Sequence, residues 1–148
     1  SANGHTILAQ NWDTYTWQEY GTVILQILRD DGPDLMIVTE AGQLARYGMN
    51  QAGIALGVNS LQKTYNPEVF GIPSVFIRCK FLEQDRYVDA VNQIFGAESM
   101  LPMYYVAAYC GGDAMGFEKL KDGQLVLYPE NGLIAHSNHI RHHIMHIR

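Results

Sequence analysis

The histidines near the end of the chain are the side chains whose spacing most directly suggests chemistry. His136, His139, His142, His143 and His146 are five of the six histidines in the chain. On a helix, His139 with His143 and His142 with His146 would share a face at the i, i+4 spacing that metal ligands use. No cysteine or carboxylate is interleaved to complete a site, so we favour an exposed tail. A histidine-rich metal-binding module is the alternative.

Nucleophilic chemistry would need an activated cysteine or serine. Cys79 falls in a helical run and Cys110 at the end of a strand, and the two form neither a metal spacing nor a disulfide framework. Both are expected to be small buried hydrophobic residues. They leave the cellular compartment open, with the cytoplasm preferred.

Asp13 follows an alternating, β-rich stretch from His5 to Trp12 that predicts a strand. The preceding Asn3-Gly4 is the strongest short hairpin signal, because a type I′ turn needs positive φ at both central residues. In that register Asp13 faces a position about seven residues before Ser1. Ser1 would then lie roughly 23 Å from the partner of Asp13, which argues against Ser1 as a nucleophile. We therefore expect residues 1–148 to be a single truncated domain whose first strand precedes Ser1.

The composition restricts the class of protein further. The chain has 148 residues, a net charge of −5, 47 % hydrophobic and 17 % charged residues, which excludes a disordered tail. The acidic balance and the absence of a Lys/Arg cluster argue against nucleic-acid binding. The apolar runs are too short to span a bilayer. We expect no nucleic-acid partner and no membrane partner.

Strands before and after a central helical pair predict an α+β fold with helices packed on an antiparallel sheet. Pro73–Leu82 and Asp85–Phe95 are the expected helices, with Asp85 as the N-cap and Gly96 ending the second. Tyr65–Gly71 is expected to be a loop. The predicted strands are Thr22–Leu28, Asp34–Thr39, Leu44–Met49, Gly53–Leu61, Met103–Cys110, Ala114–Glu118, Gln124–Tyr128 and Gly132–Asn138.

Three stretches carry a resemblance to a known family: Gln10-Asn11-Trp12-Asp13; Thr39-Glu40-Ala41-Gly42 running through Gly48-Met49-Asn50-Gln51-Ala52-Gly53 to Gly57-Val58-Asn59-Ser60-Leu61; and His136-Ser137-Asn138-His139. The chain resembles the acyl-coenzyme A:6-aminopenicillanic acid acyltransferase (isopenicillin N acyltransferase) family. That family is a branch of the N-terminal-nucleophile hydrolases, related to the bile-salt hydrolases and penicillin V acylases. The resemblance implies an αββα sandwich of two antiparallel sheets between helical layers.

The resemblance also implies a mechanism without a cofactor. An N-terminal cysteine, exposed when the precursor cuts itself, attacks an amide or thioester carbonyl, with its own α-amino group as the base. By the same resemblance, Asp13 would orient that amine, Asn59 would donate to the oxyanion, and Asn138 would be a second asparagine beside the scissile bond. Each also has an ordinary interpretation, as a solvated aspartate, an asparagine at a strand end or a buried asparagine.

The chain departs from the family in lacking the nucleophilic cysteine and in ending at Arg148, where the family continues with further strands. We expect a fragment of an acyltransferase or amidohydrolase that acts on a linear amide or an acyl-coenzyme A thioester and is inactive alone. A non-catalytic metal-binding or ligand-binding module is the alternative. Aromatic residues near the start could line an acyl pocket, although core packing is expected for most of them: Trp12, Tyr15, Trp17 and Tyr20. Unpaired sheet edges would favour a homo-oligomer.

Overall fold

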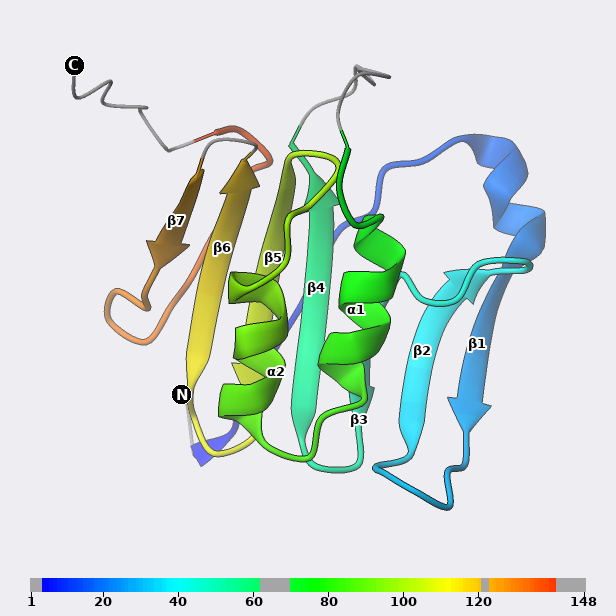
Figure 1. The fold of residues 1–148 in the computed structure, drawn as a ribbon, viewed down its shortest axis with the longest axis horizontal. Coiled ribbons are helices and arrows are strands. Elements are labelled where there is room, and N and C mark those ends of the chain that lie inside the picture. Colours follow the sequence, from blue (N-terminus) through cyan, green and yellow to red (C-terminus); the bar gives the residue numbers. More distant parts are fainter. Residues whose placement is uncertain (1–3, 62–69, 121–122, 141–148) are drawn as a thin grey trace.

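The computed structural model describes residues 4–61, 70–120 and 123–140. They form one antiparallel sheet of seven strands, in which each strand pairs with the next along the chain (Figure 1). The α+β fold is confirmed. The strands are β1 Thr22–Ile27, β2 Leu35–Glu40, β3 Tyr47–Asn50, β4 Ile54–Ser60, β5 Met103–Tyr109, β6 Ala114–Leu120 and β7 Gly123–Leu127.

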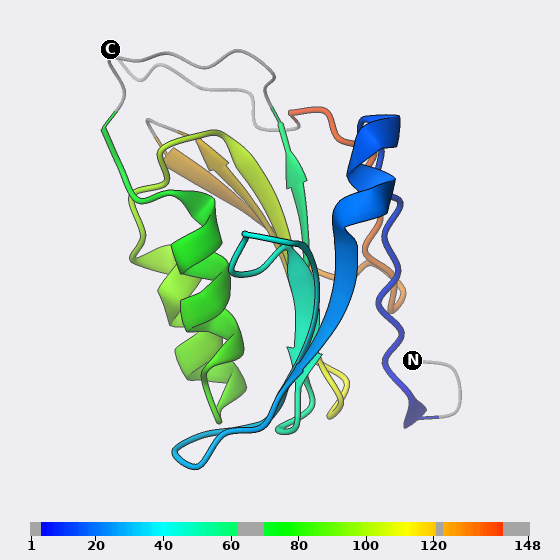
Figure 2. The same cartoon turned by 90° about the vertical axis from the view of Figure 1, so that its right-hand side faces the viewer.

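Both α-helices, α1 (Ser74–Leu82) and α2 (Tyr87–Phe95), lie on the same face of the sheet (Figures 1 and 2). The core forms between the helices and the sheet because alternate strand residues point toward the helices. Phe81 of α1 and Ile94 of α2 are fully buried there. The ring of Phe117 on β6 meets that of Phe95 edge to face, with ring centroids 5.2 Å apart.

Asn50 joins the helical layer to the sheet. Its side-chain amide donates to the carbonyls of Leu82 (2.9 Å) and Gln84 (2.8 Å), just where α1 ends. Its Oδ1 accepts from the amide of Ile54 (3.1 Å), which closes the turn between β3 and β4. One buried side chain therefore satisfies three backbone groups that have left regular secondary structure.

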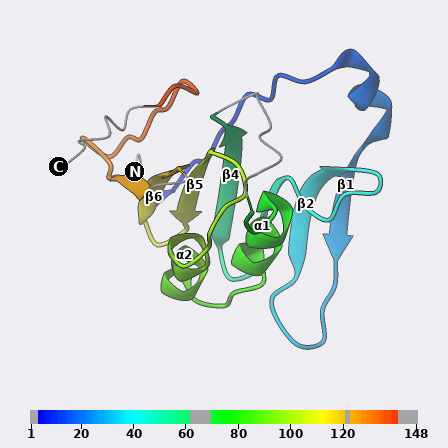
Figure 3. The same ribbon diagram turned by 45° about the horizontal axis from the view of Figure 1, so that its top comes forward.

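The two faces of the sheet are covered differently. The helices do not reach β1, whose six residues are all exposed (Figure 3). On the face opposite the helices lie two irregular segments, 5–15 and 129–140 (Figure 2). None of the described helices is long and apolar enough to cross a membrane.

Two predicted strands are wrong. The stretch from His5 to Trp12 is extended but has no strand partner among the described residues, and the predicted Asn3-Gly4 turn lies partly outside them. The stretch Gly132–Asn138 makes only an isolated bridge, between Glu130 and Leu133, because positive φ at Gly132 (78°) and Asn138 (60°) interrupts extended backbone.

Smaller differences concern element ends. β3 begins at Tyr47 rather than Leu44, and the N-cap of α2 is Arg86 rather than Asp85, with no side-chain capping bond. The other strands and both helices are confirmed to within about two residues at each end, the usual uncertainty of such bounds. Most of the predicted loop Tyr65–Gly71 lies outside the described residues.

Candidate active site

The face opposite the helices contains a hollow of about 1280 Å³. Its floor comes from β4 and β5, and its walls come from the two irregular segments, 5–15 and 129–138. Asp13, Asn59 and Asn138, predicted from positions far apart in the sequence, all line it. The structure thus brings the three predicted side chains to one cavity, which we call the sheet-face cavity.

Strand register places a row of polar groups on the floor of the sheet-face cavity. Asn59 on β4 lies opposite Tyr104 on β5, and Tyr104 lies opposite Glu118 on β6. Because side chains alternate along a strand, these residues point away from the helices while their neighbours enter the core. Asn59 is therefore on the cavity side because the adjacent Val58 is buried on the core side.

His136 lies on this row. Its ring stacks on that of Tyr104, with centroids 3.7 Å apart and planes 8° from parallel. Its Nε2 lies 2.9 Å from Oε1 of Glu118, and both side chains are almost fully enclosed. The amide N–H of Asn138 donates to Nδ1 of the same ring (3.1 Å). The third predicted site residue is thereby tied to the floor of the cavity through His136.

Gln10 anchors the segment that carries Asp13. Its side-chain amide donates to the carbonyl of Val58 and accepts from the Val58 amide, each at 2.8 Å. Because β3 pairs with β4 only at Leu56 and Ala55, the backbone of Val58 has no partner from β3. The Gln10 amide takes the place of that missing strand. Gly57 permits the approach, since a Cβ there would lie 2.9 Å from Oε1 of Gln10.

The ion pair between Arg46 and Glu40 supports Trp12, the aromatic residue directly before Asp13. Arg46 donates to both carboxylate oxygens of the buried Glu40, each at 2.5 Å, which is the bidentate geometry that Arg favours. The guanidinium also lies over the Trp12 ring, 4.8 Å from its centroid. The edge of Tyr47 meets the same ring, with centroids 6.2 Å apart. Trp12 is thus held from two sides.

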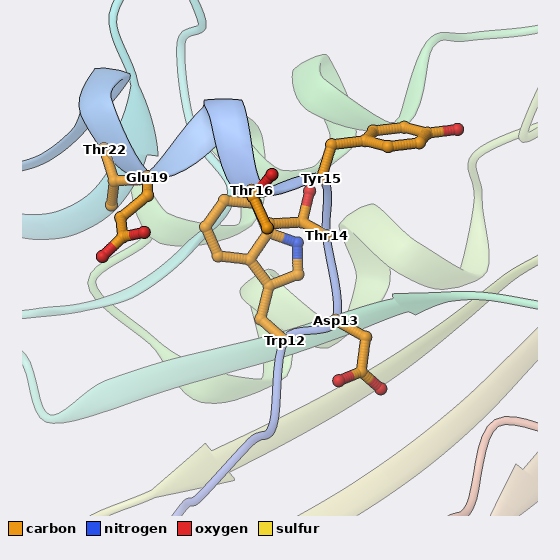
Figure 4. A pocket seen from close by; sticks show the side chains of 7 residues that line it. All are labelled: Trp12, Asp13, Thr14, Tyr15, Thr16, Glu19 and Thr22. Atoms are coloured by element: carbon orange, nitrogen blue, oxygen red, sulfur yellow. The ribbon is translucent and has the colours of Figure 1, made fainter.

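Asp13 itself is exposed and has no hydrogen bond or ion pair with the described residues. Figure 4 shows its carboxylate pointing away from the ring of Trp12, beside a smaller hollow of about 630 Å³. The side-chain amide of Asn59 likewise has no hydrogen-bond partner within the described part of the chain. Within the described residues, both groups thus line the sheet-face cavity without a hydrogen-bond partner.

Some predictions about side chains are wrong. Tyr15, Trp17 and Tyr20 do not pack in the core but are strongly exposed, because they lie on or next to the short 3₁₀ helix Thr16–Gly21, none of whose residues is buried. Cys110 is exposed, whereas Cys79 is half-buried and burial raises the pKa of its thiol. Within residues 4–61, 70–120 and 123–140, no group of histidine, cysteine and carboxylate side chains could hold a metal ion. His142, His143 and His146 lie outside the described residues.

Sequence reasoning missed Gln10, Glu118 and the role of His136. Glu118 carried a detectable signal, because a carboxylate inside a strand with buried neighbours needs a partner. Gln10 stands in the stretch Gln10-Asn11-Trp12-Asp13 that carries the family resemblance, but its contact could not be predicted, since its partner is a backbone group 48 residues away. His136 was considered among the histidines that could bind a metal ion and as part of the stretch His136-Ser137-Asn138-His139, but no positioning role was predicted for it.

Comparison with solved structures identifies the fold. An N-acylethanolamine-hydrolyzing acid amidase ortholog from Caenorhabditis elegans superimposes with a TM-score of 0.63 at 14 % identity, covering 82 % of this chain and 57 % of that chain. A penicillin V acylase from Agrobacterium tumefaciens matches with a TM-score of 0.48 at 17 % identity, covering 65 % of this chain and 33 % of that one. The fold is that of an N-terminal-nucleophile hydrolase, of which the described residues form one sheet and one helical layer.

The family follows from the sequence. Residues 1–147 match the family model of acyl-coenzyme A:6-aminopenicillanic acid acyl-transferase, and the chain belongs to this family. The acyl-coenzyme A:6-aminopenicillanic-acid-acyltransferase 40 kDa form of Emericella nidulans is 28 % identical over 131 residues, which are 88 % of this chain. The match spans 36 % of the length of that relative.

Proposed function

We propose that the protein acts as an acyltransferase or amidohydrolase on a linear amide or acyl thioester, through an acyl-enzyme on an N-terminal cysteine outside residues 1–148. Family membership supports the reaction type. The observation that carries the proposal further is that Asp13, Asn59 and Asn138 line one cavity. On this proposal, the chain supplies the groups that surround the nucleophile, and the nucleophile comes from another part of the protein.

The chemistry assigns one task to each residue. The thiolate attacks the carbonyl carbon, so that an S–C bond forms and the carbonyl oxygen becomes an anion. The neutral amide of Asn59 donates to this oxyanion and does not titrate, and Asn138 supports the same centre. The amine or thiol then leaves with a proton from the α-ammonium group of the cysteine, and water or an acceptor amine releases the acyl group.

Asp13 is suited to orienting the α-amine. Its carboxylate is exposed and without a partner among the described residues, so it can accept a hydrogen bond from an ammonium group. Gln10 fixes the segment on which Asp13 stands, and the Arg46 guanidinium holds the neighbouring Trp12. The carboxylate is thereby presented from a supported backbone, as a charge that must orient another group requires.

The sheet-face cavity has room and apolar surface for an acyl group beside its polar groups. A cavity of about 1280 Å³ exceeds the roughly 300–1000 Å³ of common small-molecule pockets. Leu8, Val106 and Leu133 contribute apolar surface to it, beside the ring of Trp12. Asn59 lines the same cavity, so on this proposal the acyl chain lies on the apolar surface and its carbonyl is bound at Asn59.

The proposal is tested with the natural protein that contains this sequence. We expect a newly exposed N-terminal cysteine by N-terminal sequencing, and an acyl-enzyme by mass spectrometry after mixing with an acyl thioester or an amide. Asn59→Ala is expected to lower kcat on the order of 100- to 1000-fold, as loss of one oxyanion donor does. Asn92→Ala, on the exposed side of α2, is the matched control and should leave kcat unchanged. Absence of any acyl-enzyme in the wild-type protein would refute the proposal.

A further inference from the structure

The imidazole of His136 is held by three different kinds of contact. Glu118 lies at its Nε2 (2.9 Å), the amide N–H of Asn138 at its Nδ1 (3.1 Å), and the ring of Tyr104 against its face. Only 3 % of the His136 side chain and none of the Glu118 side chain is exposed. The ring of His139 lies farther out, with its centroid 5.8 Å from that of His136. Among the described residues, no other ring or charged group contacts His136.

These contacts fix the position of the proton on the ring. A backbone N–H can only donate, so Nδ1 of His136 must accept from Asn138 and carries no hydrogen. The proton of the neutral ring is therefore on Nε2, from which it donates to the Glu118 carboxylate. Both nitrogens are engaged, which leaves neither free to act as a general base or to bind a metal ion.

The hydrogen bond at Nδ1 of His136 supports a strained backbone conformation at Asn138. Asn138 has a φ of 60°, a left-handed conformation that costs energy for a residue other than glycine. Asparagine tolerates this region better than most residues, but the conformation still needs support from its surroundings. The hydrogen bond from the Asn138 amide to His136 supplies that support on the side facing the sheet.

We propose that His136 is a positioning residue: in its Nε2–H form, set by Glu118, it holds Asn138 in the left-handed conformation that presents this residue to the sheet-face cavity. The functional part of this inference rests on the proposed acyl transfer. The contact of a side chain at residue i with the amide of residue i+2 is the pattern of an Asx turn, which asparagine side chains also form.

That pattern provides a matched pair of variants. In His136→Asn the side-chain oxygen takes the place of Nδ1 and can accept from the Asn138 amide, while the contact with Glu118 is lost. In His136→Gln the longer side chain can reach Glu118, but the acceptor for Asn138 is displaced. His136→Phe keeps a ring to stack on Tyr104 and loses both hydrogen bonds.

The experiment compares kcat and KM of these variants with an acyl thioester as substrate, in the natural protein. We expect His136→Asn to keep kcat within about threefold of wild type, whereas His136→Gln and His136→Phe lose about tenfold or more in kcat, less than the loss of an oxyanion donor itself. KM should change little, because the oxyanion forms only in the transition state. A kcat for His136→Gln equal to or above that of His136→Asn would overturn the proposal.

A spectroscopic measurement is independent of activity. Two-bond ¹H–¹⁵N correlation spectra of the wild-type protein with ¹⁵N-labelled histidine distinguish the tautomers, and the His136 signal is identified by its loss in His136→Asn. We expect the Nε2–H form; an Nδ1–H ring would overturn the proposal whatever kcat the variants show. A wild-type protein without acyl activity would refute the proposed function, whereas the tautomer would still test the contact at Asn138.

Discussion

Replacing Gln10 with alanine should release the segment that carries Asp13 without unfolding the sheet. The side chain makes two hydrogen bonds, to the amide and the carbonyl of Val58, each 2.8 Å long. At about 1 kcal/mol for each bond, the segment loses roughly 2 kcal/mol of its docking free energy. Since about 1.4 kcal/mol corresponds to a factor of ten, the open form becomes roughly 30 times more populated.

Native-state hydrogen exchange at the Val58 amide measures this change directly. That amide donates to Oε1 of Gln10, whereas the other side of the β4 backbone faces β5. In Gln10→Ala the exchange rate of the Val58 amide should rise roughly 30-fold, by the same two hydrogen bonds. Amides in the ladder between β4 and β5 should exchange as in the wild-type protein.

The matched control is Gln26→Ala. Gln26 is exposed on β1 and its side chain makes no hydrogen bond with the described residues, so the exchange of the Val58 amide should not change. If Gln10→Ala also left that exchange within twofold of wild type, the Gln10 contact would contribute nothing to docking. The argument that a side-chain amide replaces a strand at this edge would then fail.

Three further predictions concern the sheet and its core. Asn50→Ala should lower the free energy of unfolding by about 3 kcal/mol in urea titrations, at about 1 kcal/mol for each of three hydrogen bonds; a loss below about 1 kcal/mol would contradict the satisfied-backbone argument. Gly57→Ala should raise exchange at the Val58 amide, because a Cβ would lie 2.9 Å from Oε1 of Gln10, and it should add little to Gln10→Ala. Burial raises the pKa of Tyr105 from 10.0 to about 12, so stability that is complete below pH 10 should be lost as the pH rises toward 12. Tyr105→Phe should weaken that alkaline loss in unfolding experiments, and an unchanged pH dependence would refute the assignment.

The elements that the sequence predicts well are those whose pattern depends only on their own residues. β4 alternates small or polar residues with Ile54, Leu56 and Val58, which enter the core, and its predicted range is confirmed to within a residue. The helical stripe of α2 buries Val91 and Ile94 as its period requires. In such segments burial on one face and local propensity favour the same structure.

The errors arise where the structure depends on a distant partner. The stretch from His5 to Trp12 alternates like a strand, but alternation does not supply a second backbone. Among the described residues it has no strand partner, and it meets the sheet through side chains such as Gln10 and Trp12. In the candidate site, Asp13 and Asn59 were found through a family resemblance. The Glu118–His136 contact joins residues 18 positions apart through cross-strand register, which one sequence does not reveal.

The register of β4, β5 and β6 couples the packing of the core to the alignment of the residues on the cavity floor. The row that faces the cavity consists of Asn59, Tyr104 and Glu118. The next row faces the helices and consists of Val58, Tyr105 and Phe117. A slip of one residue would exchange the rows, moving the Glu118 carboxylate away from His136 into the apolar core and the Phe117 ring onto the cavity side. A fold with an intact core therefore also has its cavity-side residues on β4, β5 and β6 correctly paired. The packing that selects the correct hydrophobic core during folding therefore also sets the alignment of the site residues.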